Sequence, residues 1–284
     1  MIVDIHTHFF RPRLDFTPKL RADLARAGID PEAWGDVPAR HLATTRAADA
    51  AVVLAFQAAA TGWNVPNDAA AAHARSAPGL IFFASVDPAQ SGFRAELERC
   101  HQDLRCQGVK LAPIYQGVHP LDPRYREIYA YCQKHGLAIL IHMATTFCGG
   151  IPLEYARPAH MDQVAIEFPD LKIVLAHLGH PWEGEAIAAI RRNPNLFADV
   201  SALYYRPWQF YNSLRLLVEY RAEAKVLFGS DFPFTTTADS IAGVRNVNAV
   251  IATSGLPRIP EEVLEGIVQR EALQLLGLKI PAKA

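Results

Sequence analysis

Two histidines, His6 and His8, stand one residue apart in the run IVDIHTHFF at residues 2–10. Side chains alternate along a strand, so residues at this spacing point the same way and can grip one ion from a single strand. A lone His-x-His pair is weak evidence, because most histidines at strand ends have ordinary packing roles. The pair gains weight only if other ligand-type residues of the chain can meet it.

Short apolar runs without strict polar alternation recur along the sequence, which is typical of strands covered on both faces. We predict eight such strands, at 2–6, 51–55, 80–85, 108–111, 137–142, 172–177, 196–200 and 225–231. Amphipathic stretches predict helices at 93–106, 122–136 and 260–277. Eight strands alternating with helices favour an α/β fold, a single (β/α)₈ TIM-barrel domain over residues 1–284, rather than a doubly wound sheet.

One segment, residues 9–45, breaks this regular rhythm. It combines some helical character with four prolines, which are Pro12, Pro18, Pro31 and Pro38. We interpret it as an insertion after the first strand that distorts the barrel. A long segment at that place is more often a lid or a subunit contact than idle chain.

In a barrel of this kind the chemistry sits at the carboxyl ends of the strands, which converge over the barrel mouth. Ligand-type residues close four of the predicted strands, and we expect them to form a metal centre. They are His6, His8, His142, His177 and Asp231. Six further histidines fall in predicted helices or loops, where we expect ordinary roles. They are His41, His73, His101, His119, His135 and His160.

The composition argues against several classes of partner. With 28 basic and 29 acidic residues the formal net charge is −1, which gives no electrostatic footprint for nucleic acid or an anionic membrane. No apolar run reaches the roughly 18 residues of a membrane helix, and no secretory signal is visible. The four cysteines are scattered, as expected of reduced thiols. We therefore expect a cytoplasmic protein that acts on a small molecule.

Four stretches, DIHTH, ILIHMATT, IVLAHLGHPW and VLFGSDFPF, resemble the strand ends of the amidohydrolase superfamily. The similarity covers about residues 2–277 and is greatest to the amidohydrolase-related branch, which includes aminocarboxymuconate-semialdehyde and resorcylate decarboxylases. The resemblance implies one divalent metal ion, zinc first, with manganese or iron as alternatives. The ligands it implies are His6, His8, His142 and Asp231. It also implies a catalytic role for His177 and a homodimer.

Two reactions are open to such a centre. A divalent ion lowers the pKa of bound water from about 15.7 towards 7, Asp231 can take up the water proton, and His177 can polarise a substrate oxygen. Our first expectation is hydrolysis of a C–O or C–N bond in a small planar acid, lactone or amide. The alternative is non-oxidative decarboxylation of an aromatic or muconate-like acid, in which Asp231 and His177 protonate the carbon that loses CO₂. A non-catalytic metal-binding barrel is a third possibility, against which the intact ligand set argues.

The substrate pocket is the least determined feature. Lys110 has three interpretations: a carboxylated bridge between two ions, a cation for a substrate carboxylate, or a structural ion pair. His180 stands where the family often has glycine, and it is either a substrate contact or a local substitution.

Aromatic residues near the predicted mouth, together with Arg206, would form a flat apolar pocket with a carboxylate anchor. These aromatic residues are Phe9, Trp63, Phe147, Trp182, Tyr204, Tyr205, Trp208 and Phe232. The residues expected to bind substrate are Lys110, Arg206, His180, Trp182 and Trp63.

Overall fold

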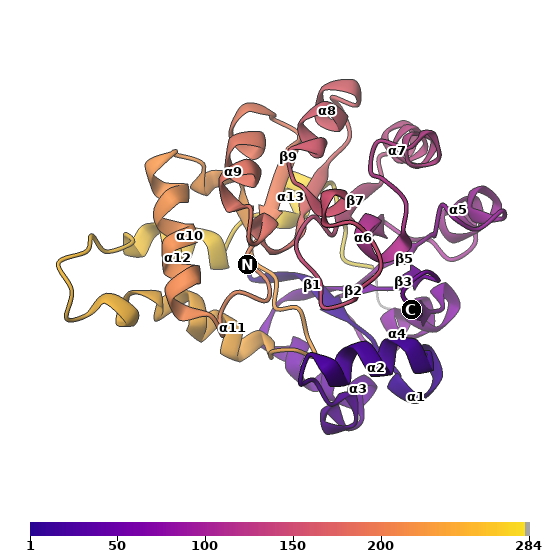
Figure 1. Ribbon diagram of the computed structural model, residues 1–284, viewed down its shortest axis with the longest axis horizontal. Helices are drawn as coiled ribbons and strands as arrows, with labels where there is room; N and C mark the ends of the chain where they lie inside the picture. The colour runs from indigo at the N-terminus through magenta and orange to yellow at the C-terminus, as the bar shows by residue number, and fades with distance from the viewer. Residues whose placement is uncertain (282–284) are drawn as a thin grey trace.

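Eight parallel strands form one curved sheet in the order β1-β2-β5-β6-β7-β8-β9-β10 (Figure 1). Their bounds are β1 Val3–His8, β2 Ala50–Leu54, β5 Leu80–Ser85, β6 Gly108–Leu111, β7 Ala138–Ile141, β8 Ile173–Leu175, β9 Leu196–Asp199 and β10 Val226–Leu227. The computed structural model describes residues 1–281, so residues 282–284 of the expected domain lie outside it. Every residue of these strands is buried, as strands covered on both faces require. The predicted TIM barrel is confirmed.

The barrel closes where the chain after β10 runs beside β1. Three backbone hydrogen bonds make this seam: Ile5 N to Phe228 O (3.1 Å), Asp231 N to His6 O (2.8 Å) and His8 N to Phe232 O (2.8 Å). The seam is irregular because the strand predicted at 225–231 ends at Leu227. The metal-ligand candidates on both sides of the seam are therefore joined through main-chain bonds.

Helices surround the strands (Figure 1). Their bounds are α4 Asn67–Arg75, α5 Phe93–Gln102, α6 Pro113–Gln116, α7 Pro123–His135, α8 His160–Glu167, α9 Glu183–Arg192, α10 Pro207–Glu219, α11 Thr237–Arg245, α12 Glu261–Val268 and α13 Ala272–Leu276. Short 3₁₀ turns add η2 Thr45–Ala47, η3 Leu153–Ala156, η4 Ala176–Gly179, η5 Glu223–Lys225 and η6 Val247–Ile251. The single helix predicted at 260–277 is two helices, α12 and α13. Among residues 1–281 no helix has both the length and the apolar character needed to cross a bilayer.

The start and stop signals of α7 work as the sequence predicts. The Asp122 side chain accepts a hydrogen bond from Arg124 N, Pro123 occupies the first turn, and Gly136 ends the helix with φ 66°. A proline in the first turn loses no intrahelical bond, and glycine takes the left-handed conformation without a Cβ clash. These local signals fix where the helix before β7 ends.

The insertion at residues 9–45 folds as α1 Pro12–Asp15, α2 Pro18–Arg26, the 3₁₀ turn η1 Pro31–Trp34 and α3 Val37–Thr44. In Figure 1 it lies, in indigo, along one side of the barrel. Its four prolines all stand at the first or second position of one of these elements. A short hairpin, β3 Phe56–Ala58 and β4 Trp63–Val65, packs beside it and has no counterpart among the predicted strands. Phe16 of the insertion forms a bridge to Trp63.

Close packing inside the sheet gives a first testable prediction, at Gly108 on β6. A Cβ at this position would lie 2.4 Å from the Phe83 ring and 2.6 Å from the carbonyl oxygen of Ala138. We expect Gly108→Ala to lower the free energy of unfolding by about 2 kcal/mol, because the neighbouring strand must move. Chemical denaturation measures this change. Gly184→Ala in α9 is the control, since nothing lies within 4 Å of its added Cβ; equal stability of the two variants would contradict the packing described.

Candidate active site

Three ligand-type atoms meet at the carboxyl end of β1. His6 Nε2 lies 3.2 Å from His8 Nε2 and 3.4 Å from Asp231 Oδ1, and His8 Nε2 lies 3.3 Å from the same Asp231 oxygen. All three side chains are buried. Asp231 reaches the two histidines because the seam bond from its N–H to His6 O holds the loop after β10 against β1. We call this group the triangle.

The triangle fits a divalent metal ion. Burial lowers the pKa of His6 and His8 well below the ordinary value, so both imidazoles keep a lone pair for coordination. Burial raises the pKa of the Asp231 carboxyl well above its ordinary value. A metal cation beside this carboxyl would favour its charged form. Ligand atoms about 2.0–2.1 Å from a tetrahedral zinc ion lie roughly 3.3 Å apart, close to the edges of the triangle.

A fourth buried group, Asp199 at the end of β9, contacts the nitrogen of the His6 ring that faces away from the triangle. Its Oδ2 is 2.9 Å from His6 Nδ1, and its Oδ1 accepts hydrogen bonds from His177 N (2.9 Å) and Ser201 N (3.0 Å). A carboxylate on the far nitrogen of a metal-ligating histidine fixes the tautomer and turns the other nitrogen to the metal. The sequence analysis missed Asp199, although it closes a predicted strand and the strand-end criterion would have selected it.

His177 lies next to the triangle with its ring stacked on His6 at a centroid distance of 5.0 Å. Its Nδ1 is 3.1 Å from Ser201 O, and a carbonyl can only accept, so Nδ1 carries the proton and Nε2 keeps its lone pair. The residue has a left-handed φ of 58°, which ends β8 two residues before the predicted boundary. Asp231, the last residue of the strand predicted at 225–231, is also left-handed, with φ 63°, and β10 ends before it at Leu227. Such conformations are uncommon outside glycine and concentrate at functional sites.

His142 does not join the triangle. Its Nε2 lies 3.0 Å from Ala144 O and 3.1 Å from Thr145 O, and both are acceptors, so this nitrogen donates to the backbone. Its Nδ1 is therefore the atom left for a ligand, and burial lowers the pKa of the ring to about 3. The role of His142 as a fourth metal ligand stays a prediction.

Lys110 contacts the triangle rather than the substrate space. Its Nζ is 3.1 Å from His6 Nε2, and burial lowers its pKa to about 8. Within the described residues it makes no ion pair shorter than 4 Å, and it does not line the cavity described next. The structural ion pair thus has no counterpart, while the roles of bridge and substrate cation stay predictions.

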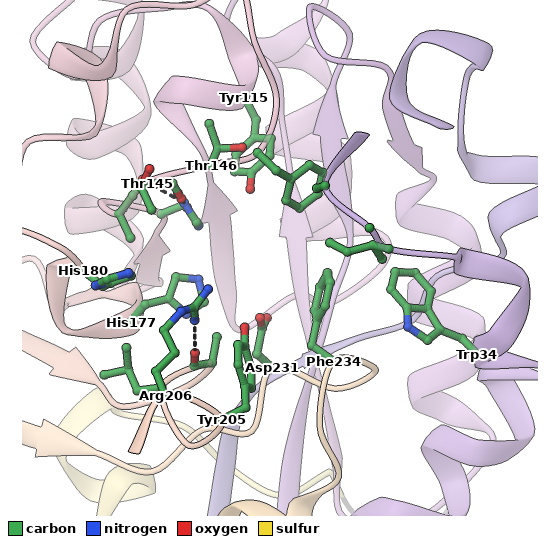
Figure 2. A pocket seen from close by; sticks show the side chains of 18 of the residues that line it. Trp34, Tyr115, Thr145, Thr146, His177, His180, Tyr205, Arg206, Asp231 and Phe234 are labelled. Atoms are coloured by element: carbon green, nitrogen blue, oxygen red, sulfur yellow. Dashed lines mark hydrogen bonds between the residues drawn. The ribbon is translucent and has the colours of Figure 1, made fainter. Parts of the chain in front are cut away.

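A cavity of about 690 Å³ opens over the triangle (Figure 2). Figure 2 shows Trp34 and Phe234 on one side of it and His177, His180 and Arg206 on the other, with Asp231 below. Its described lining residues are Ala27, Gly28, Ile29, Asp30, Trp34, Tyr115, His142, Ala144, Thr145, Thr146, Phe147, His177, His180, Ala202, Leu203, Tyr205, Arg206, Asp231 and Phe234. The cavity is therefore aromatic, and Arg206 is the one arginine or lysine among the described residues that line it.

The insertion supplies a wall of this cavity. Residues 27–30 lie in the connection between α2 and η1, and Trp34 is the last residue of η1. Arg26 Nη2 donates to Phe147 O on the facing loop at 2.9 Å. A lid or a subunit contact is what the sequence predicts for residues 9–45, with no individual residue assigned to the cavity. The segment carries no ligand-type pattern, so its wall residues are visible only once the chain is folded.

Two of the expected substrate contacts lie elsewhere. Trp63 is packed in the core between Phe10 and Phe16, at ring centroid distances of 4.9 and 4.7 Å, because β4 turns it inward. Trp182 precedes α9 and its ring lies 5.3 Å from the Arg157 guanidinium, away from the cavity. Neither of these two residues lines the cavity.

Of the other aromatic residues expected at the mouth, two, Phe147 and Tyr205, line the cavity. Phe9, Tyr204, Trp208 and Phe232 are not part of its wall. Phe232 is fully buried, whereas Trp208 is largely exposed on the surface. The cavity instead takes Trp34, Tyr115 and Phe234, which the sequence analysis did not select.

The remaining two expected contacts, His180 and Arg206, do line the cavity. The Arg206 guanidinium lies 4.6 Å from the centroid of the Tyr205 ring, and its Nη1 donates to Ala202 O at 2.9 Å. The stacking holds a planar cation at the cavity wall with most of its N–H groups still free for a ligand.

The chain matches a known protein family over almost its whole length. A family model described as Amidohydrolase matches residues 3–278. The chain belongs to the amidohydrolase family. This places the barrel and the triangle in a superfamily of metal-dependent enzymes whose members bind a divalent metal.

The amidohydrolase is similar to two curated decarboxylases. It is 26% identical to a 6-methylsalicylic acid decarboxylase of Penicillium expansum, over 96% of this chain and 95% of that protein. It is 24% identical to a 2-amino-3-carboxymuconate-6-semialdehyde decarboxylase of Dictyostelium discoideum, over 64% and 56% of the two chains. An uncharacterised TIM-barrel protein of Bordetella bronchiseptica has the same fold, with a TM-score of 0.74, 23% identity and coverage of 97% and 98%.

Proposed function

We propose that this amidohydrolase is a metal-dependent, non-oxidative decarboxylase of a small aromatic or conjugated acid. The observation that carries the proposal is the cavity, in which aromatic walls and one guanidinium lie over the triangle. Both relatives described above are decarboxylases, which supports decarboxylation over hydrolysis, the reaction expected first from the sequence. Hydrolysis would use the same ligands, so the choice is left to the experiment below.

The residues present suit the metal that this chemistry needs. His6, His8 and Asp231 would hold the ion, with His142 as the predicted fourth ligand and zinc, manganese or iron as candidates. When bound, the ion acts as a Lewis acid that stabilises negative charge on a substrate oxygen. Asp199 keeps His6 turned towards the triangle and so sets the ligand geometry.

The cavity residues would bind and orient the substrate. A flat ring suits the aromatic walls, which exclude water and strengthen the electrostatic interactions inside. Arg206 offers paired N–H groups, the geometry that a carboxylate accepts best. The ring of the substrate would thus lie between the aromatic walls, with its acidic group at Arg206 on the exposed edge of the cavity.

The reaction replaces the bond between the ring carbon and the carboxylate by a C–H bond. The electron pair of the broken bond stays on the carbon, CO₂ departs, and one proton is added to that carbon. Asp231 and His177 line the cavity and are the groups that can hold this proton at the carbon. His177 is oriented for this by its bonds to Ser201 and Asp199, which leave Nε2 free.

The test is a comparison of substrates in D₂O with metal-loaded protein. We expect 2-hydroxybenzoates or conjugated unsaturated acids to release CO₂ and to yield a product with one deuterium at the carbon that lost the carboxylate. Headspace CO₂ and mass spectrometry of the product measure this. Matched lactones and amides of the same size serve as the comparison. Hydrolysis of these compounds without any CO₂ from the acids would replace the proposal with the hydrolase.

A further inference from the structure

His180 presents one edge of its ring to the protein and the other to the cavity. It follows η4 and precedes α9, and its Nδ1 lies 3.2 Å from Glu183 Oε1 and also contacts the amide of Gln209. Its Nε2 has no hydrogen-bond partner in residues 1–281, and the side chain is 14% exposed. Since His180 lines the cavity, this second nitrogen is the one open to a ligand.

Glu183 is built into the protein as a fixed partner for this imidazole. It lies in the first turn of α9, is 9% exposed, and its Oε1 also accepts from Gln209 Nε2 (3.0 Å) and Ser213 Oγ (3.2 Å) of α10. Burial by itself raises the pKa of Glu183, but the hydrogen bonds from His180 and its neighbours outweigh it and leave the pKa below the ordinary value. The Glu183 carboxylate therefore fixes the His180 ring with Nδ1 towards the protein and Nε2 towards the cavity.

One side of the cavity therefore presents an imidazole and a guanidinium, both of which can donate to acidic groups. Figure 2 shows His180 and Arg206 together, across from Trp34 and Phe234, which offer only rings and an indole N–H. Arg206 is exposed, whereas His180 is mostly buried, so a substrate whose single acidic group pairs with Arg206 would leave His180 Nε2 desolvated without a partner, which is unfavourable. The volume of about 690 Å³ has room for a ring with further substituents.

We propose that His180, held by Glu183, donates from Nε2 to a second acidic oxygen of the substrate, a carboxylate or a phenol hydroxyl other than the reacting group. His180 is thus a residue that sets specificity, and Glu183 is a positioning residue. The inference rests on the proposed function for the class of ligand, an aromatic acid, and narrows it to acids with two acidic groups.

Binding of small ring acids to the metal-loaded protein, measured by isothermal titration calorimetry, tests this without any turnover. We expect isophthalate to bind the wild-type protein at least about 10-fold more tightly than benzoate, beyond the twofold that two equivalent carboxylates give. The third ligand, 3-hydroxybenzoate, shows whether a hydroxyl or only a carboxylate is accepted. In His180→Ala the ratio of the two affinities should fall to about two, and Glu183→Gln should lie between.

Two control variants are matched to these substitutions. His160→Ala removes a histidine bound to Glu154 outside the cavity, and Glu185→Gln alters the same turn of α9 where the carboxylate pairs with Arg157. Both should keep the wild-type ratio, and thermal melts confirm that every variant is folded. A folded His180→Ala with an unchanged ratio would overturn the inference and leave His180 a structural residue.

The outcomes separate this inference from the proposed function. If isophthalate binding depends on His180 but no acid releases CO₂, the decarboxylase proposal fails and the role of His180 stands. If CO₂ is released from acids with a single acidic group as fast as from those with two, the role of His180 fails and the decarboxylase stands. If the metal-loaded protein binds none of the three acids, the inference fails together with the aromatic acid as ligand.

Discussion

The His8→Ala variant will be purified without its divalent metal ion and will lose on the order of 10³-fold in kcat/KM. One corner of the triangle then disappears. Of its donor atoms only His6 Nε2 and Asp231 Oδ1 remain, beside the predicted ligand His142, which lies outside the triangle, and this weakens the binding of a divalent ion. Elemental analysis of the purified protein and initial rates with the best substrate measure the two losses together.

The matched control is His101→Ala, which removes a histidine of α5 that bonds to the Tyr131 hydroxyl. It should keep its metal and its rate. Wild-type metal content in His8→Ala would show that the triangle is not the metal centre. Unchanged activity in a metal-free His8→Ala protein would remove the metal from the mechanism altogether.

The second large effect is expected at Asp199, which contacts His6 Nδ1 and does not line the cavity. Asn at this position keeps the shape but loses the charge, so the imidazole of His6 is oriented less firmly towards the triangle. Substitution of such outer partners weakens metal binding about 10–100-fold, and we expect Asp199→Asn at the upper end because the same carboxylate also holds His177 N. Competition with a chelator of known affinity measures the dissociation constant.

Asp162→Asn is the control for charge removal, since this aspartate pairs with Arg192 and Asn193 on the surface. It should bind metal as the wild-type protein does. Equal metal affinity in Asp199→Asn and Asp162→Asn would show that the bond to His6 does not support the metal centre, whatever its effect on stability.

The fold could be predicted from the sequence because the strands of a parallel barrel are apolar on both faces. That composition marks β5 and β6 to the residue. Prediction failed at the ends of β8 and β10, which stop at Leu175 and Leu227, before the predicted boundaries at residues 177 and 231. The residues at these two boundaries, His177 and Asp231, have a left-handed backbone. Tertiary bonds such as the one from His177 N to Asp199 hold these conformations, and no local signal announces them.

The triangle was predictable in part, because the i, i+2 spacing of His6 and His8 places both side chains on the same side of one strand. The nitrogen that His142 offers depends on the two carbonyls of the loop that follows it, which no spacing rule contains. The aromatic walls were the hardest part. Trp63 and Trp34 are both aromatic residues of loop-rich segments, and only the packing of the hairpin and of the insertion decides which of them reaches the cavity.

The origin of the cavity wall in a separate stretch of chain has a consequence for evolution. The reactive floor is encoded by strand ends that the barrel itself keeps in place, whereas residues 27–34 belong to a surface excursion tied down at Arg26. Changes in that excursion can alter which molecules are accepted while the chemistry beneath is inherited intact. New substrate specificities would therefore arise first through substitutions in the segment between β1 and β2.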